Sequence, residues 1–317
     1  MRVGLKLSLF TAGWLAAIGT AQAADHIRVG TPEGTAYVFA PIDVGNGAGI
    51  FEKHGLTVEK LNFAGGGKIG EAMSANAVDV TVSGNTDLAF IAKGEPAKAV
   101  AVAFGAPVEM AIIVRSDGSI AQPADLKGKT IGVTSPTSLT SYLALAFARD
   151  QGWGADGIKR AYVGSMTSEV AGLLTKNVDA IVGPVEGAYL LQEKGQGQPL
   201  MTFGEMKSFI THIIYAHNNF IKDHPDALRR FLAAWFDTVA YMKTHKAETI
   251  RLTEPVTKLP PDIADKVYDL ETPALTDHGR FDEKALTATM QSFLEVGVLD
   301  KLPDNLKALY TEEFLPK

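Results

Sequence analysis

Hydroxyl-bearing side chains are concentrated in one short segment, residues 134–141. The segment follows residues 129–134, whose apolar and β-branched side chains predict a short buried strand. A helix is predicted next, because apolar side chains recur at every fourth position: Leu139, Leu143 and Phe147. The hydroxyls therefore stand where a strand ends and a helix begins.

The start of this helix is a candidate binding site for an anion. Ser135 stands at the N-cap position and Pro136 at the first helical position, where its missing N–H costs nothing. The N–H groups of a first helical turn have no partners inside the helix, and the helix dipole favours negative charge beside them. The candidate ligand-binding residues here are Thr134, Ser135, Thr137 and Ser138. The alternative interpretation is an ordinary capped helix.

Glu186 and Tyr37 are candidates for contacts with another part of a ligand. Glu186 closely follows a predicted strand, in a loop with Gly183 and Gly187, where its carboxylate could pair with an amine. The alternative is a solvated Glu that stabilises a helix start. Tyr37 lies in a turn-rich loop and could stack on a ligand or simply pack.

The glycine-rich segment that starts at Gly65 has the pattern G-x-G-x-x-G, with Asp87 about twenty residues further on. This pattern is typical of dinucleotide binding, but it follows the second predicted strand rather than the first. We therefore expect no cofactor. We expect instead a flexible turn that brings backbone N–H groups to a cleft.

No pattern for a metal site or for catalysis is present. The seven histidines are scattered without metal-ligand spacing, and the chain has no cysteine. A G-x-S-x-G nucleophile motif is also absent. We expect no metal and no catalytic residue.

The first 23 residues have the features of a cleaved signal peptide. Arg2 and Lys6 are followed by a mostly apolar stretch at 7–18, and an A-x-A site ends at Ala23. Cleavage after Ala23 would leave 294 residues, enough for two domains. Without cysteine, neither a disulfide nor a lipid anchor can form. We expect a soluble protein of the Gram-negative periplasm.

The charge of the chain argues against two classes of partner. Loss of Arg2 and Lys6 would take the net charge from −6 to −8. An acidic protein of this kind is not expected to bind nucleic acid or an anionic membrane surface.

Strands alternate with short helices, which predicts an α/β fold with mostly parallel sheets. The predicted strands are 26–31, 57–63, 78–82, 99–104, 111–115, 129–134, 161–163, 178–182 and 212–216. Helices are predicted at 38–44, from 65–67 to 76, from 87, from 225, and at 261–270, 282–296 and 302–310. Two doubly wound sets joined by two extended crossings, near 111–115 and 212–217, would form a cleft between the carboxyl ends of their strands. Hinge closure over a ligand is the expected motion.

An ordered series of motifs resembles a known family. GTAY, GIFEKHGLTVE, FxGGG, AVDVxxSGN, DLKGKTIGV, LLTKNVDA and FIKDHPDALRRFLAAW follow one another over essentially all of the mature chain. The series is similar to the substrate-binding proteins of bacterial ABC importers for nitrate, sulfonates and taurine, which are related to binders of thiamine-pyrimidine precursors. Each motif is weak alone, but their order is fairly specific.

The resemblance implies a type II periplasmic-binding-protein fold, whose C-terminal helices return to lobe 1. Lobe 1 would comprise 24–112 and 217–317, and lobe 2 would comprise 113–216. The ligand contacts carried over are Gly34, Thr35, Tyr37, Gly66, Gly67, Ser83, Gly84, Asn85, the helix start at Thr134–Ser138, and Glu186. The implied partners are a small-molecule ligand and a membrane permease, and a monomer is expected.

Our hypothesis is a periplasmic receptor for a small organic anion, similar to a sulfonate or taurine. Many sulfonate binders have a Trp-Asp-Pro-like segment where this chain has Gly183-Pro184-Val185-Glu186. The alternative ligand is therefore a pyrimidine, a thiamine precursor or another aminated or aromatic solute. An enzyme on the same scaffold is a further alternative, although the related desulfinases and pyrimidine synthases rely on a cysteine.

Overall fold

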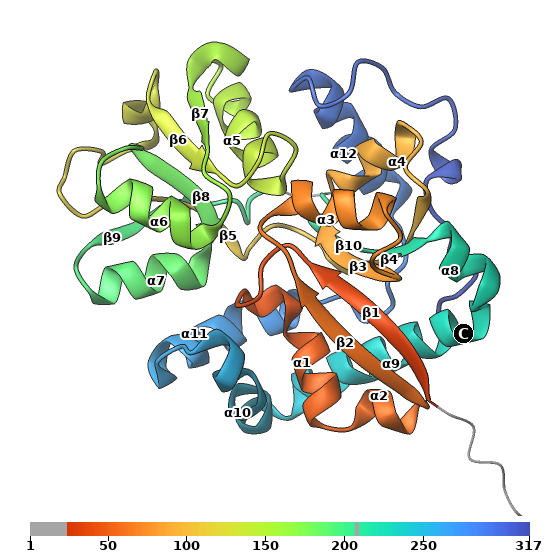
Figure 1. The fold of residues 1–317 in the computed structure, drawn as a ribbon. Helices are drawn as coiled ribbons and strands as arrows, with labels where there is room; N and C mark the ends of the chain where they lie inside the picture. Colours follow the sequence, from red (N-terminus) through yellow and green to blue (C-terminus); the bar gives the residue numbers. More distant parts are fainter. Residues whose placement is uncertain (1–23, 207–208) are drawn as a thin grey trace, which may run out of the picture.

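The computed structural model describes residues 24–206 and 209–317. The predicted signal peptide and its cleavage site at Ala23 lie outside these residues. The described chain forms two α/β lobes, each built on a five-stranded sheet (Figure 1). None of its helices has the length and apolar run that a membrane crossing requires.

The first sheet has the strand order β2-β1-β3-β10-β4. Its strands are β1 (Asp25–Thr31), β2 (Leu56–Asn62), β3 (Val80–Gly84), β4 (Ala97–Phe104) and β10 (His212–His217). The pairs of β1 with β2 and with β3 are parallel, whereas β10 runs antiparallel to β3 and to β4.

The second sheet has the equivalent order β7-β6-β8-β5-β9. Its strands are β5 (Met110–Arg115), β6 (Thr130–Val133), β7 (Lys159–Tyr162), β8 (Ala180–Pro184) and β9 (Gly197–Thr202). Here β6 is parallel to β7 and β8, and β5 is antiparallel to β8 and β9.

Both sheets are mixed, because each crossover enters a sheet from the other lobe and runs against its neighbours. The two crossover strands, β5 and β10, place the lobe boundaries at other residues than expected. All of β5 belongs to the second sheet, so 110–112 does not lie in lobe 1. All of β10 belongs to the first sheet, so 212–216 does not lie in lobe 2. Strand β9 was not predicted, because its sequence, GQPLMT, has a proline and forms the sheet edge.

Short helices connect the strands of each lobe. In lobe 1 these are η1 (Tyr37–Phe39), α1 (Ala40–Gly47), α2 (Ile50–Lys53), α3 (Gly66–Ser74) and α4 (Asp87–Ala92). In lobe 2 they are η2 (Pro123–Leu126), α5 (Leu139–Asp150), η3 (Ala155–Gly157), α6 (Met166–Leu174) and α7 (Val185–Glu193).

The C-terminal region is helical and packs mainly on lobe 1 (Figure 1). Its elements are α8 (Asn218–Asp223), α9 (Pro225–Thr244), α10 (Lys246–Thr257), α11 (Pro261–Glu271), η4 (Thr272–Ala274), α12 (Glu283–Glu295) and η5 (Leu306–Ala308). The long helix α9 packs against α1 and α2, where the rings of Phe231 and Phe51 stack at 5.7 Å. The helix expected at 302–310 is only the short η5, since Pro303 and Asn305 disfavour an earlier start.

Helix α12 also connects the lobes. The hydroxyls of Tyr142 on α5 and Ser292 on α12 form a buried hydrogen bond of 2.6 Å. The Tyr142 ring packs edge-on against Phe293 and stacks on Phe209, which lies just before β10. Burial raises the pKa of Tyr142 to about 12. The lobes are thus held together along α5, which leaves the other side of the interface for a cleft.

Candidate functional site

A cavity of about 80 Å³ lies between the two lobes. Parallel strands of both sheets end beside it, as expected for ligand sites of open α/β sheets. Lobe 1 contributes Pro32, Glu33, Ala36, Val38, Phe39, Gly65, Gly66, Gly84 and Glu271, and the crossovers contribute Glu109, Met110 and His212. Lobe 2 contributes Thr134, Ser138, Leu139, Thr140, Met166, Glu169, Pro184 and Glu186.

Four buried glutamates converge on this cavity. Glu109 lies just before β5, Glu169 lies on α6, Glu186 lies in the first turn of α7, and Glu271 is the last residue of α11. Their exposed fractions are 1%, 0%, 5% and 0%, in that order. No Lys or Arg is among the described residues that line the cavity. The site is therefore strongly acidic in composition.

Glu186 of lobe 2 and Glu271 of lobe 1 face each other across the interface and influence each other's pKa. Burial raises the pKa of Glu186 to about 7, despite the hydrogen bond from the Tyr37 N–H. The pKa of Glu271 lies well above its ordinary value, first because of burial and then because of repulsion from Glu186 and Glu109. The pKa of Glu169 is also well above its ordinary value, because of burial and the nearby Glu33.

Glu109 and His212 join the two crossovers at the back of the cavity. His212 is the first residue of β10, and its Nδ1 lies 3.2 Å from Glu109 Oε1. Both side chains are buried. The His212 ring also packs edge-on against Phe39 and Phe104. Because these residues lie at the crossovers that link the two sheets, the pair is placed where a hinge would act.

Tyr37 and Glu186 were expected to contact a ligand, but in the structure they contact each other across the two lobes. The backbone N–H of Tyr37 donates to Glu186 Oε1 at 2.8 Å. The Tyr37 side chain is buried and its hydroxyl is 2.7 Å from Thr272 Oγ1, so the ring does not line the cavity. Glu186 lies in helix α7 rather than in a loop, and it is buried rather than solvated.

The hydroxyl-rich segment before α5 is largely satisfied by its own chain. The helix begins at Leu139, and Ser138 is the N-cap, with its Oγ accepting from the Ser141 N–H. The predicted cap at Ser135, with Pro136 as the first helical residue, is therefore wrong. Ser138 Oγ donates to the Ser135 carbonyl, which folds 135–138 into a turn in place of a helical turn.

Glycines allow the lobes to approach closely at this segment. A Cβ on Gly84 would lie 2.8 Å from the Leu139 Cβ, across the interface. A Cβ on Gly65 would lie 2.9 Å from the Thr134 Cβ, and Gly65 has a φ of +82°. Gly66 begins helix α3, so the glycine run is a helix start rather than a free turn.

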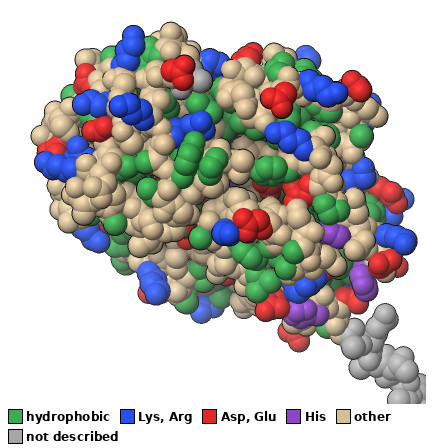
Figure 2. All heavy atoms as spheres, turned by 45° about the horizontal axis from the view of Figure 1, so that its top comes forward, with side chains coloured by type: hydrophobic (Ala, Val, Ile, Leu, Met, Phe, Trp, Pro, Cys, Tyr) green, Lys and Arg blue, Asp and Glu red, His purple; other side chains and the backbone are tan. Residues whose placement is uncertain are grey.

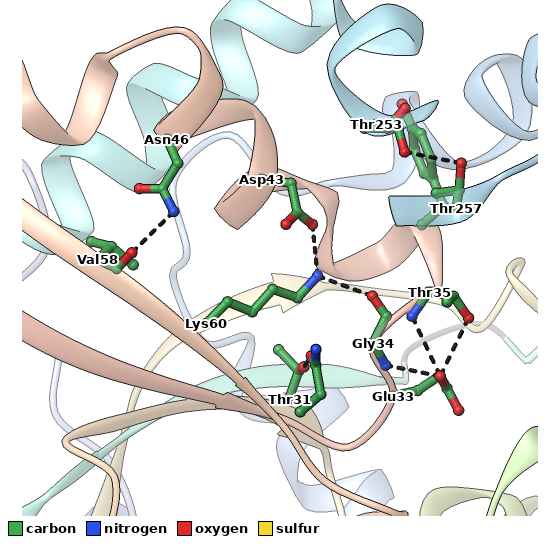
Figure 3. Close-up of polar contacts among 12 residues, drawn as sticks. Thr31, Glu33, Gly34, Thr35, Asp43, Asn46, Val58, Lys60, Thr253 and Thr257 are labelled. Atoms are coloured by element: carbon green, nitrogen blue, oxygen red, sulfur yellow. Dashed lines mark hydrogen bonds and ion pairs between the residues drawn. The ribbon is translucent and has the colours of Figure 1, made fainter. Parts of the chain in front are cut away.

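The loop that leads from β1 to Tyr37 is fixed from lobe 1 (Figure 3). Lys60 Nζ donates to the Gly34 carbonyl at 3.2 Å and to Asp43 Oδ2 at 2.6 Å. Glu33 Oε1 accepts from the Gly34 N–H at 2.8 Å, and more weakly from Thr35. Glu33 is thus engaged by its own loop, unlike the four buried glutamates.

Five of the thirteen proposed ligand contacts line the cavity: Gly66, Gly84, Thr134, Ser138 and Glu186. Thr35 lines an adjoining hollow that shares Glu33, Ala36, Met166, Pro184 and Glu186 with the cavity. Gly67, Ser135 and Thr137 line a wide groove on another side of the interface, together with Thr134. The side chains of Ser83, Asn85 and Tyr37 are buried, and neither Gly34 nor Tyr37 is among the residues that line the cavity.

Sequence reasoning did not find Glu109, Glu169, Glu271 and His212. None belongs to a spacing pattern, and a single Glu in a short helix is ordinarily a solvated residue. The described residues contain no group of three or more His, Asp or Glu side chains arranged to hold a metal ion.

Comparison with known proteins places the chain in a family. A sequence model described as NMT1/THI5 like matches residues 36–249, more than half of the chain. No curated protein sequence matches it significantly.

Several solved structures have the same fold at low sequence identity. The alkanesulfonate-binding protein SsuA from Xanthomonas axonopodis pv. citri, bound to MOPS, superposes with a TM-score of 0.79 at 17% identity, covering 92% of this chain and 99% of that one. The periplasmic aliphatic sulphonate binding protein SsuA from Escherichia coli gives 0.74 at 18% identity, covering 90% and 92%. The desulfurization enzyme DSZB gives 0.64 at 15% identity, covering 92% and 97%. The chain therefore belongs to the NMT1/THI5-like family and has the type II periplasmic-binding-protein fold.

Proposed function

We propose that this protein is the solute receptor of an ABC importer. It binds a small organic molecule in the cavity between its lobes and delivers it to a membrane permease. The observation that carries the proposal is the position of the cavity, between the strand ends of two lobes and sealed by contacts from both. Location in the periplasm, after removal of residues 1–23, is part of the proposal.

The contacts across the interface support hinge closure as the binding motion. The hydrogen bond from the Tyr37 N–H to Glu186 and the close approach of Gly84 to Leu139 both join opposite lobes. These contacts break if the lobes separate at the crossovers, which opens the cavity to solvent. We therefore assign these contacts to the closed form of the receptor.

The charges in the cavity bear on the two ligand classes that the sequence leaves open. A sulfonate or taurine-like anion would meet four buried carboxyl groups, and no Lys or Arg among the described residues that line the cavity. The hydroxyls of Ser138 and Thr140, which could hold an anion, already contact the chain's own groups. The aminated or aromatic alternative therefore has more support from the geometry than the anion.

Catalysis is not part of the proposed function. DSZB has the same fold, and one DSZB structure is that of a cysteine-to-serine mutant in complex with biphenyl-2-sulfinic acid. This chain has no cysteine that could serve as a nucleophile. Turnover of a bound compound by the purified protein would contradict the proposal.

The proposal includes no nucleic-acid partner, and the protein is proposed to act as a monomer. On the face in Figure 2, basic and acidic side chains are interspersed over the periphery, and hydrophobic side chains gather toward the middle. On this face the described basic side chains form no continuous stripe of the kind that nucleic-acid binding needs.

Calorimetry combined with small-angle X-ray scattering tests the proposal. The mature protein is titrated with ethanesulfonate, taurine, nitrate, 4-aminopyrimidine and simple amines. A compound of the ligand class is expected to bind and to decrease the radius of gyration as the lobes close. If no compound binds below about millimolar concentration or changes the radius, the proposed receptor function is contradicted.

A further inference from the structure

The four glutamates that line the cavity have acceptor atoms without donors. Glu109 Oε1 faces His212 Nδ1 at 3.2 Å, and the carboxyls of Glu186 and Glu271 are close enough to share one proton. The other oxygens, among them both of Glu169, are buried and have no hydrogen-bond donor within the described residues. The exception is Glu186 Oε1, which accepts from the Tyr37 N–H. Such a concentration is unusual, because buried polar groups in folded proteins are almost always paired.

The described part of the chain does not provide a counter-charge for most of this cluster. Among the described residues that line the cavity, His212 is the one ionisable side chain of opposite sign, and it lies beside Glu109. The same set of residues places no Lys or Arg beside Glu169, Glu186 and Glu271 in the cavity wall. Burying a charged carboxylate without a counter-charge costs much free energy. These carboxyl groups are therefore either protonated or paired with a cation that binds in the cavity.

We infer that the ligand is a small organic cation with several N–H donors, such as an amidinium, a guanidinium or a primary ammonium group. The inference rests on the proposed receptor function and names its ligand class. Glu169 and Glu186 contact the cation from lobe 2, and Glu271 contacts it from lobe 1. The ligand then supplies both the missing donors and the missing positive charge. It also attracts carboxyls of both lobes, which stabilises the closed form.

The need for donors distinguishes this ligand from a quaternary ammonium ion. Quaternary ammonium ions are recognised by the faces of several aromatic rings. Among the described residues of the cavity wall, Phe39 is the one aromatic side chain besides His212, and the two rings pack edge-on. A methylated nitrogen cannot donate to the carboxyl oxygens, whereas an amidinium donates from a planar fork that fits two acceptors.

The remaining walls limit the size of the ligand. Val38, Met110, Leu139 and Met166 supply hydrocarbon between the carboxyls. Met166 fills the space beside Gly183 and Gly187, where any Cβ would lie within 2.6 Å of its side chain. A volume of about 80 Å³ is enough for a short alkyl or planar group.

Matched pairs of small probes test the inference on the mature wild-type protein at pH 7.5 and low salt. Acetamidinium and acetate have the same shape and opposite charge. Ethylammonium and ethyltrimethylammonium have the same charge but differ in donors. We expect acetamidinium and ethylammonium to bind and to reduce the radius of gyration. Acetate, ethanesulfonate and ethyltrimethylammonium should bind at least tenfold more weakly.

Substitution of one carboxyl gives an independent readout. Glu169→Gln retains the size of the side chain and removes its charge, so acetamidinium affinity should fall about 10- to 150-fold, the effect of losing a charged hydrogen bond. Glu71→Gln is the matched control, because Glu71 is exposed on α3 and should leave the affinity unchanged. Gln is neutral in both the folded and the unfolded state, so it avoids the cost of burying a charged Glu169. The variant is therefore expected to be at least as stable as the wild type at pH 7.5.

The outcomes separate this inference from the receptor function. Closure around ethanesulfonate without closure around either N–H cation would overturn the inference and leave the receptor function standing. Equal binding of ethylammonium and ethyltrimethylammonium, or an unchanged affinity of Glu169→Gln for acetamidinium, would also overturn it. If none of these probes produces closure at millimolar concentration, the inference is contradicted, and the receptor function is contradicted as well if taurine, nitrate and 4-aminopyrimidine also fail.

Discussion

The stability of the unliganded protein should decrease as pH rises from 5 to 8. A carboxyl with a raised pKa in the folded state holds its proton over a pH range in which the unfolded chain has lost it. The free energy of unfolding therefore falls with rising pH over that range. For Glu186 the range extends from its ordinary pKa of 4.5 to about 7.

The magnitude follows from the same values. A pKa that moves from 4.5 to about 7 corresponds to roughly 3 kcal/mol of stability lost above pH 7. The raised pKa values of Glu169 and Glu271 act in the same direction, as does that of Asp87, which burial raises to about 8. The lowered pKa of His217 opposes them. For a chain of this size, about 3 kcal/mol lowers the melting temperature by on the order of 6 °C.

Thermal melts of the mature protein from pH 5 to 8 measure this effect. Glu186→Gln should flatten the profile by on the order of 3 kcal/mol, since a Gln oxygen can still accept from the Tyr37 N–H. Glu71→Gln, exposed on α3, should leave the slope unchanged. A melting temperature that stays constant or rises between pH 5 and 8 would refute the reasoning.

Three further predictions concern closure, capping and protons. Gly84→Ala should weaken probe binding about 5- to 150-fold without lowering the melting temperature, because its Cβ meets Leu139 only in the closed form, whereas Gly70→Ala should change neither. Ser138→Ala should destabilise the protein by about 1 kcal/mol in urea unfolding, because it removes the N-cap bond to the Ser141 N–H; an unchanged stability would contradict the capping role. Acetamidinium binding at pH 6.5 should release protons, measured by calorimetry in two buffers of different ionisation enthalpy. The same heat of binding in both buffers would contradict the predicted proton release.

The fold could be predicted because its local signals agree with its tertiary structure. On α9, the side chains of Leu228, Phe231, Leu232, Trp235 and Val239 recur at helical spacing, and all are fully buried. The strand β3 alternates in sequence and is followed by a helix that begins at Asp87, as predicted. Burial of a periodic apolar face fixes such elements wherever they occur.

The element boundaries at the site were harder to predict, because side-chain contacts decide them. Both Ser135 and Ser138 are acceptable helix caps by residue type. The structure selects Ser138, because its Oγ reaches the Ser141 N–H while Thr140 Oγ1 accepts from the Thr134 N–H. Sequence spacing contains neither contact.

The acidic character of the cavity could not be predicted from local sequence. Glu169 and Glu271 are 102 residues apart in the chain, each on a short helix. Glu271 is buried where α11 returns beside η1 and α7, and Glu169 is buried beside Gly183 of β8. Both are tertiary contacts. No local pattern identifies either residue as buried. The sequence therefore predicts a binding site at the hydroxyls of 134–138 and not at these glutamates.

The most direct test of the account is a crystal structure of the mature protein grown with acetamidinium. We predict that the amidinium lies in the cavity between the lobes, with its nitrogen atoms about 2.7–3.2 Å from carboxyl oxygens of Glu169 or Glu186 and of Glu271. An amidinium bound elsewhere, or an anion in the cavity beside Ser138, would contradict the account.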